Sequence, residues 1–186
     1  MNLVISGRHS SAVRHSSHNF STGQMSVPAR LMIFSTSVPY STSMPLCENG
    51  KIIDGIRLTF KKGKVVDFFA EKGYEDLKTL IETDSGTRRL GEVALIGKSS
   101  PIAQSKILFF NTLFDENASC HLALGTAYPT TIKNGDKLNK KQLKDLGAND
   151  SVEHIDFMIG TSDMTIIGVK KDKSEQIIFS NGEWNF

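Results

Sequence analysis

The sequence predicts an α+β fold with a mixed, largely antiparallel sheet and a few short helices. Residues 51–71 contain two β-type runs on either side of a Lys-Lys-Gly-Lys turn, in which Gly63 supplies the positive φ of a tight hairpin. Residues 163–184 contain a second pair of such runs, separated by a polar turn at 170–175. Hairpins at both ends of the patterned region indicate antiparallel pairing, because parallel strands need long crossover connections.

The segments between the two hairpins mix helical and strand patterns. Apolar residues recur at helical spacing over 74–83, which predicts a short amphipathic helix. Residues 85–97 lead into a short apolar strand with Glu92 at its entrance. Two further apolar runs, 105–114 and 151–160, also have the character of strands.

Residues 118–128, Ala-Ser-Cys-His-Leu-Ala-Leu-Gly-Thr-Ala-Tyr, fit either a helix or a strand. The absence of β-branched residues before Gly125 favours a helix that ends at this glycine. In such a helix His121 and Tyr128 would be seven residues apart on one stripe. The polar stretch 139–147 predicts another short helix.

The composition narrows the classes of function. A net charge of +2 gives no electrostatic argument for binding nucleic acid or a membrane surface, and no apolar run is long enough to span a bilayer. Cys47 and Cys120 form neither a disulfide framework nor a zinc-ribbon spacing, so we expect a reducing, cytoplasmic location.

The first part of the chain has a different character. Residues 1–42 are rich in serine and show no sustained period, and every acidic residue lies at Glu48 or beyond. We expect 1–42 to be a disordered or non-native segment, such as the product of a shifted reading frame, and 43–186 to form the ordered domain. An organelle transit peptide is the alternative for the opening residues, because such peptides are also rich in serine and poor in acids.

His154 and Asp156 are the first pair that could carry chemistry. On a strand, residues two apart point to the same face, so this imidazole and carboxylate would project side by side. Both are good ligands for zinc, cobalt and similar ions. The alternative is that the pair lies on the exposed face of an edge strand, since His-x-Asp is a common pattern.

Other acids extend this set. Glu92 enters an apolar strand, while Asp115 and Glu116 could be ligands, supporting groups that orient a ligand histidine, or charges at a helix N-terminus. The last role is the favoured one for Asp115. A candidate metal site would draw on Glu92, His121, His154 and Asp156, although no compact zinc signature accompanies them.

Three longer blocks resemble a known family. They are Arg-Arg-Leu-Gly-Glu-Val-Ala-Leu at 88–95, Leu-Phe-Asp-Glu-Asn-Ala-Ser-Cys-His-Leu-Ala-Leu-Gly-Thr-Ala-Tyr-Pro at 113–129, and His-Ile-Asp-Phe-Met-Ile-Gly at 154–160. The chain from about residue 43 onward is similar to the aminopeptidase T / aminopeptidase S family of metal-dependent aminopeptidases. The resemblance implies release of N-terminal residues from peptides, two divalent ions per site (zinc or cobalt, with magnesium as a further candidate), and a homodimer.

The resemblance also implies roles for individual residues. The metal ligands fall on Glu92, His121, His154 and Asp156, while Tyr128 would stabilise the oxyanion and Glu116 would support the ligands. The family has one more glutamate ligand upstream, whereas residues 1–47 contain no glutamate. We therefore expect weak or absent turnover, and a non-catalytic metal-binding or interaction remnant of the same fold is the alternative.

Overall fold

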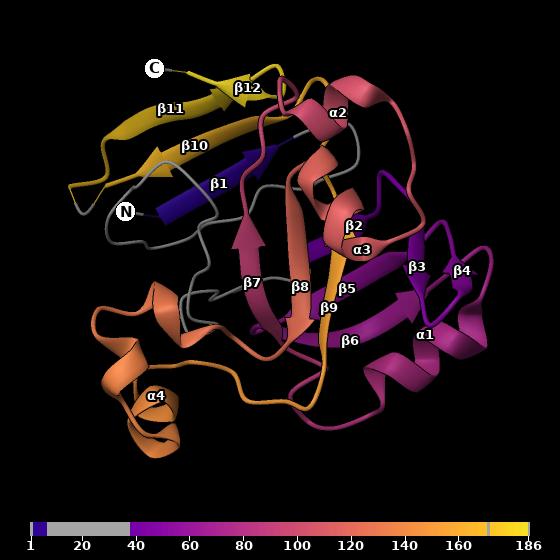
Figure 1. Cartoon of the computed structure of the whole chain (residues 1–186). Coiled ribbons are helices and arrows are strands. Elements are labelled where there is room, and N and C mark those ends of the chain that lie inside the picture. The colour runs from indigo at the N-terminus through magenta and orange to yellow at the C-terminus, as the bar shows by residue number, and fades with distance from the viewer. Residues whose placement is uncertain (1, 7–37, 171, 186) are drawn as a thin grey trace.

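The computed structural model describes residues 2–6, 38–170 and 172–185, and it confirms an α+β fold of antiparallel sheets and short helices (Figure 1). The strands are β1 (Asn2–Ser6), β2 (Val38–Ser41), β3 (Leu46–Glu48), β4 (Lys51–Ile53), β5 (Arg57–Lys61), β6 (Lys64–Phe69), β7 (Leu90–Ala94), β8 (His121–Gly125), β9 (His154–Met158), β10 (Thr165–Val169), β11 (Glu175–Ser180) and β12 (Glu183–Trp184). The helices are α1 (Tyr74–Ile81), α2 (Pro101–Ser105), α3 (Thr112–Asp115) and α4 (Lys140–Asp145), with short 3-10 turns η2 (Glu116–Ala118), η3 (Pro129–Thr131) and η4 (Gly135–Lys137).

The described strands form four sheets. Their orders are β1-β10-β11-β12, β2-β5-β6, β3-β4 and β7-β8-β9, and the paired strands run antiparallel. Figure 1 shows β7, β8 and β9 crossing in front of the β2-β5-β6 sheet. The β7-β8-β9 sheet carries the candidate site, so its register decides which side chains meet.

The core lies largely between these two sheets and α1. Leu58 and Phe60 are two residues apart and point to the same buried face of β5. Leu77 and Ile81 lie four residues apart on the buried face of α1. Burying a large apolar side chain contributes roughly 1.5–3 kcal/mol. The face of β7-β8-β9 that contributes Leu122 and its neighbours to this core is therefore held firmly in place.

Both predicted hairpins and two of the predicted helices are confirmed. The hairpins form as β5-β6 and β10-β11, and Gly63 has φ +70° in the first turn. The predicted helix over 74–83 is α1, and the predicted helix over 139–147 is α4, which begins with a capping box between Asn139 and Gln142. Each of these elements has a strong local pattern that tertiary packing reinforces.

The prediction of a strand over 105–114 is wrong. This segment is a loop that leads into α3, and its large apolar side chains Ile107, Phe109, Phe110, Leu113 and Phe114 are exposed. The buried carboxylate of Asp115 accepts backbone N–H bonds from Phe109 and Asn111, which bends the segment away from an extended course. Asp115 lies in the first turn of the four-residue helix α3, and its carboxylate accepts the N–H of the N-cap residue Asn111, so it is an acid at a helix N-terminus as predicted, although at α3 and not at a helix over 118–128.

The helix predicted over 118–128 is wrong as well. His121–Gly125 form β8, the central strand between β7 and β9, and Gly125 has φ +98° at the end of a strand rather than of a helix. All five residues of β8 are buried, because both faces of this strand are covered. A central strand gains hydrogen bonds to two neighbours, and that gain outweighs the weak intrinsic preference of Leu-Ala-Leu for a helix.

The predicted disordered or non-native segment 1–42 lies mostly outside the described residues. Two short pieces of it are described: β1 pairs with β10, and β2 pairs with β5. None of the helices in the described part of the chain combines the length and the apolar character needed to cross a membrane.

Candidate metal centre

The register of the β7-β8-β9 sheet gathers the predicted ligands on one face. Glu92 lies opposite Ala123, and Ala123 lies opposite Asp156, so these three residues form one cross-strand row. His121 and His154 are two residues from this row on β8 and β9 and share its face. Ala123 is fully buried and places only a methyl group between the two carboxylates.

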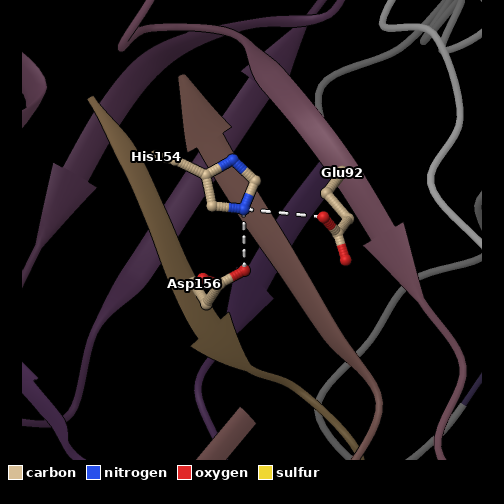
Figure 2. A group of neighbouring side chains, drawn as sticks. All are labelled: Glu92, His154 and Asp156. Atoms are coloured by element: carbon tan, nitrogen blue, oxygen red, sulfur yellow. Dashed lines mark ion pairs between the residues drawn. The ribbon is translucent and has the colours of Figure 1, made fainter. Parts of the chain in front are cut away.

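One group of ligand atoms comprises Glu92, His154 and Asp156 (Figure 2). The Nε2 atom of His154 is 3.3 Å from Oδ1 of Asp156 and 3.5 Å from Oε2 of Glu92. The side chain of Glu92 is wholly buried, and that of His154 is 13 % exposed. The alternative that His154 and Asp156 lie on the exposed face of an edge strand is therefore excluded.

A second group of ligand atoms comprises Glu116, His121 and Asp156. Glu116 comes from η2, the turn that leads into β8, so it approaches the sheet from the end at which His121 begins the strand. The Nε2 atom of His121 is 3.6 Å from Oε1 of Glu92 and 3.9 Å from Oδ1 of Asp156. Asp156 belongs to both groups, and Glu92 faces both imidazoles.

Both histidines are oriented by backbone carbonyls on the side away from the cluster. Nδ1 of His154 lies 2.8 Å from the carbonyl oxygen of Thr126, and Nδ1 of His121 lies 3.2 Å from that of Ser119. A carbonyl oxygen only accepts hydrogen bonds, so each Nδ1 carries the hydrogen. In the neutral imidazole, Nε2 then points its lone pair into the cluster, which is the arrangement found for metal-binding histidines.

The charges around the imidazoles favour a bound cation. Burial lowers the pKa of His154, but the hydrogen-bonding and charged Asp156 carboxylate outweighs this and raises it to about 9. Burial also lowers the pKa of His121, and Glu92 and Asp156 raise it above its ordinary value. A divalent ion placed between the carboxylates would satisfy the same electrostatic demand as these protons.

The carboxyl group of Glu116 is destabilised in its charged form. Burial and the charge of Asp156 raise its pKa to about 7, although His121 opposes the shift. Several carboxylates therefore crowd a small buried space and destabilise one another's charged forms. A divalent cation relieves that repulsion, so the donor set suits a metal site electrostatically.

Two buried atoms provide an independent test of whether a metal fits. Nε2 of His121 and Oδ1 of Asp156 are inaccessible to solvent and make no hydrogen bond of good geometry within the described part of the chain, although they face ionisable groups of the cluster at 3.3–3.9 Å. Leaving such a group unsatisfied costs roughly 1–3 kcal/mol. Nitrogen and oxygen donors of this kind fit zinc or cobalt, which bind imidazole and carboxylate together.

Tyr128 lies at the edge of the cluster rather than on a helical stripe with His121. Its ring is 4.5 Å from the ring of His154, and its side chain is about half exposed. Burial, together with the charges of Asp156 and Glu92, raises its pKa above the ordinary value, so the phenol keeps its proton at neutral pH. Tyr128 can therefore donate a hydrogen bond to an anionic oxygen at the metal centre.

The structure thus brings Glu92, His121, His154, Asp156 and Glu116 into one cluster, with Tyr128 beside it. The sequence predicted a supporting role for Glu116. In the structure this residue lies close enough to offer a ligand atom to the second group. Sequence reasoning missed Glu48, at the end of β3: burial raises its pKa, and so do the charges of Glu153 and Asp156. No local pattern marks Glu48, because only the packing of β3 beside β9 brings it near the cluster.

A family model and several curated proteins match this chain. The model described as thermophilic metalloprotease (M29) matches residues 38–184. Aminopeptidase 2 from Geobacillus stearothermophilus is 59 % identical over 142 residues, which cover 76 % of this chain and 34 % of the relative. Aminopeptidase T from Thermus thermophilus is 41 % identical over 145 residues, again covering 76 % of this chain and 34 % of the relative.

A solved structure shows the same arrangement of elements. Wild-type AmpT from Thermus thermophilus superposes with a TM-score of 0.79 at 32 % identity, covering 98 % of this chain and 49 % of that one. The chain spans about a third of the length of the curated relatives it matches.

Proposed function

Because this chain belongs to the thermophilic metalloprotease family, M29, we propose that it carries the metal centre of an aminopeptidase that releases N-terminal residues from peptides. One observation carries the proposal: two groups of ligand atoms share Asp156 on one face of a rigid sheet. This arrangement supports two neighbouring divalent ions, with zinc or cobalt as the first candidates and magnesium as a further one.

The proposed ligands divide between the two ions. Glu92, His154 and Asp156 would hold one ion, and Glu116, His121 and Asp156 would hold the other, with Glu92 facing both. When bound, such ions act as Lewis acids on a scissile carbonyl and lower the pKa of bound water. Glu116 takes the position of a direct ligand in this proposal, instead of a supporting group.

The side chains of the cluster also prepare it for a peptide. The carboxylates attract the N-terminal ammonium of a substrate, and the protonated phenol of Tyr128 can stabilise the oxyanion of a tetrahedral intermediate. The backbone carbonyls behind His121 and His154 fix both rings, so the ligands need little rearrangement when an ion binds.

A second candidate function follows from the ligand count. The family resemblance implies a further upstream glutamate, and residues 1–47 contain none. For residues 1–186 assayed on their own we expect slow turnover, and a metal-binding chain without catalysis is the alternative. In this proposal the substrates are peptides. The chain would act as a homodimer in the cytoplasm, without nucleic acid or membrane partners. The two free cysteines fit a reducing compartment.

Hydrolysis of leucyl-p-nitroanilide by the purified chain, with zinc or cobalt added, tests the proposal. N-acetyl-leucyl-p-nitroanilide is the control, because it lacks the free ammonium that an aminopeptidase requires. Slow release of nitroaniline from the free amine alone, lost in the Asp156→Asn variant, identifies an aminopeptidase. Metal binding without turnover identifies the non-catalytic alternative, and absence of metal binding contradicts both.

A further inference from the structure

A short segment after β8 contains the carbonyl group that orients His154. Gly125 ends β8 and is followed by Thr126, whose carbonyl oxygen lies 2.8 Å from Nδ1 of His154. Ala127 comes next and leads into Tyr128, whose ring lies 4.5 Å from that of His154. The course of this segment therefore decides how one histidine of the cluster and the neighbouring tyrosine are placed.

The side chain of Asn149, in the loop after α4, holds the first residue of the segment. Its Nδ2 atom lies 2.5 Å from the carbonyl oxygen of Gly125 and 2.8 Å from that of Gly86, with the carbonyl oxygen of Arg89 at 3.4 Å. An amide nitrogen has two hydrogens to donate, and the shorter distances assign them to Gly125 and Gly86. One side chain thus joins the end of β8 to the loop before β7.

The backbone of Asn149 holds the same segment a second time. Its carbonyl oxygen accepts the N–H of Ala127 at 2.9 Å. The N–H of Thr126 donates to the carbonyl oxygen of Glu153 at 2.7 Å. Asn149 therefore anchors the residues on both sides of Thr126, and the carbonyl of Thr126 is directed at His154.

Gly91 leaves room for this carbonyl on the other side. It is the residue at which the register between β7 and β8 shifts. A Cβ atom at position 91 would lie 2.2 Å from the carbonyl oxygen of Thr126 and 2.4 Å from that of Gly125, closer than non-bonded atoms approach. The carbonyl of Thr126 is therefore packed against the bulge of β7 as well as hydrogen-bonded to the ring of His154.

The other histidine of the cluster is oriented at the opposite end of β8. Nδ1 of His121 lies 3.2 Å from the carbonyl oxygen of Ser119, two residues earlier in the chain. His121 begins β8, whereas the side chain of Asn149 reaches Gly125 at its end. Removing the side chain of Asn149 should therefore disturb one histidine and leave the other in place.

We propose that Asn149 is a positioning residue, which aims the Thr126 carbonyl at His154 and thereby turns Nε2 of this ring into the cluster (Figure 2). The same anchored segment places Tyr128 beside the ring. The proposal rests on the proposed function for the role of His154 as a metal ligand, whereas the orientation of the ring needs no ion.

The exchange rate of each Nδ1–H proton, measured by NMR on the metal-free, ¹⁵N-labelled chain at neutral pH, tests the proposal. A ring N–H that is hydrogen-bonded to a backbone carbonyl exchanges with water only when the structure opens locally. In Asn149→Ala the proton of His154 should exchange at least about tenfold faster, while that of His121 keeps its wild-type rate. Asn139→Ala is the matched control, because it removes an asparagine side chain that caps α4 and should leave both rates unchanged.

Zinc titration gives a second readout that does not depend on turnover. Groups behind a metal-ligand histidine typically change metal affinity by about 10–100-fold. Asn149 acts through one further residue, so Asn149→Ala should lower the affinity for one of the two ions by about tenfold, at the lower end of this range. A wild-type chain that binds no zinc would contradict the proposed function, and the exchange rates would still decide the role of Asn149.

The proposal would be overturned by an unchanged exchange rate of the His154 proton in Asn149→Ala. Equal acceleration of the His154 and His121 protons would also overturn it, because that result indicates a general loosening of the sheet. If circular dichroism shows that Asn149→Ala does not fold, Asn149→Asp decides instead, since it keeps the size of the side chain and replaces the donor with an acceptor. Asn149→Asp should accelerate exchange at His154 alone, and a wild-type rate there would refute the role of the amide.

Discussion

Asp156 belongs to both groups of ligand atoms, so replacing it should affect two ions, whereas replacing Glu116 should affect one. At a free zinc concentration of 100 times the dissociation constant, each bound ion stabilises the folded chain by about 2.7 kcal/mol. Loss of a ligand carboxylate lowers the affinity for the ion that it binds by about 100-fold, a value at the upper end of the range for supporting groups. At the same zinc concentration that ion then contributes only about 0.4 kcal/mol.

The zinc-dependent stabilisation should therefore be about 5.4 kcal/mol for the wild type, about 3.1 for Glu116→Gln and about 0.8 for Asp156→Asn. For a domain of this size 1 kcal/mol corresponds to about 2–4 °C, so zinc should raise the wild-type melting temperature by about 10–20 °C. Circular-dichroism melts in EDTA and in excess zinc measure these differences. Asp67→Asn, an exposed acid on β6, is the control and should behave as the wild type. Equal zinc shifts in Glu116→Gln and Asp156→Asn would refute the assignment of Asp156 to both ions.

Three other substitutions test parts of the framework. Ala123→Leu should lower zinc affinity at least about tenfold and cost about 1–3 kcal/mol in urea unfolding, because its side chain enters the space between the ligands. Asp115→Ala should cost about 2 kcal/mol by leaving the N–H of Phe109 without its acceptor, and a change below 0.5 kcal/mol would contradict that view. The N–H of Val152 is the main cause of the lowered pKa of Asp84, so this carboxylate stabilises the fold above its ordinary pKa of about 3.9. The difference in urea midpoint between the wild type and Asp84→Asn should accordingly shrink as the pH falls below about 4; a difference that grows in acid would show the opposite linkage.

The elements with a strong local pattern could be predicted from the sequence. The β5-β6 and β10-β11 hairpins and helix α1 each combine the appropriate hydrophobic period with a suitable turn or cap. Strand β8 could not be recognised in this way, because both of its faces are buried and the alternation of apolar and polar residues disappears. For such a run, neighbouring strands decide between helix and strand.

The candidate site was also only partly predictable. The same-face placement of His154 and Asp156 follows from the two-residue period of a strand, and the family resemblance gave the other two candidates, Glu92 and His121, the role of metal ligands. The approach of Glu116 depends on the tight η2 turn before β8, and the position of Glu92 opposite Ala123 depends on a bulged register between β7 and β8. Neither can be inferred from spacing along the chain.

The number of zinc ions bound per chain tests the central claim most directly. Equilibrium dialysis against buffered zinc, followed by elemental analysis of the purified protein, gives this number without any assay of turnover. The shared position of Asp156 predicts two ions per wild-type chain and one per Glu116→Gln chain. A wild-type chain that binds one ion, or none, would contradict a dinuclear centre on the β7-β8-β9 sheet.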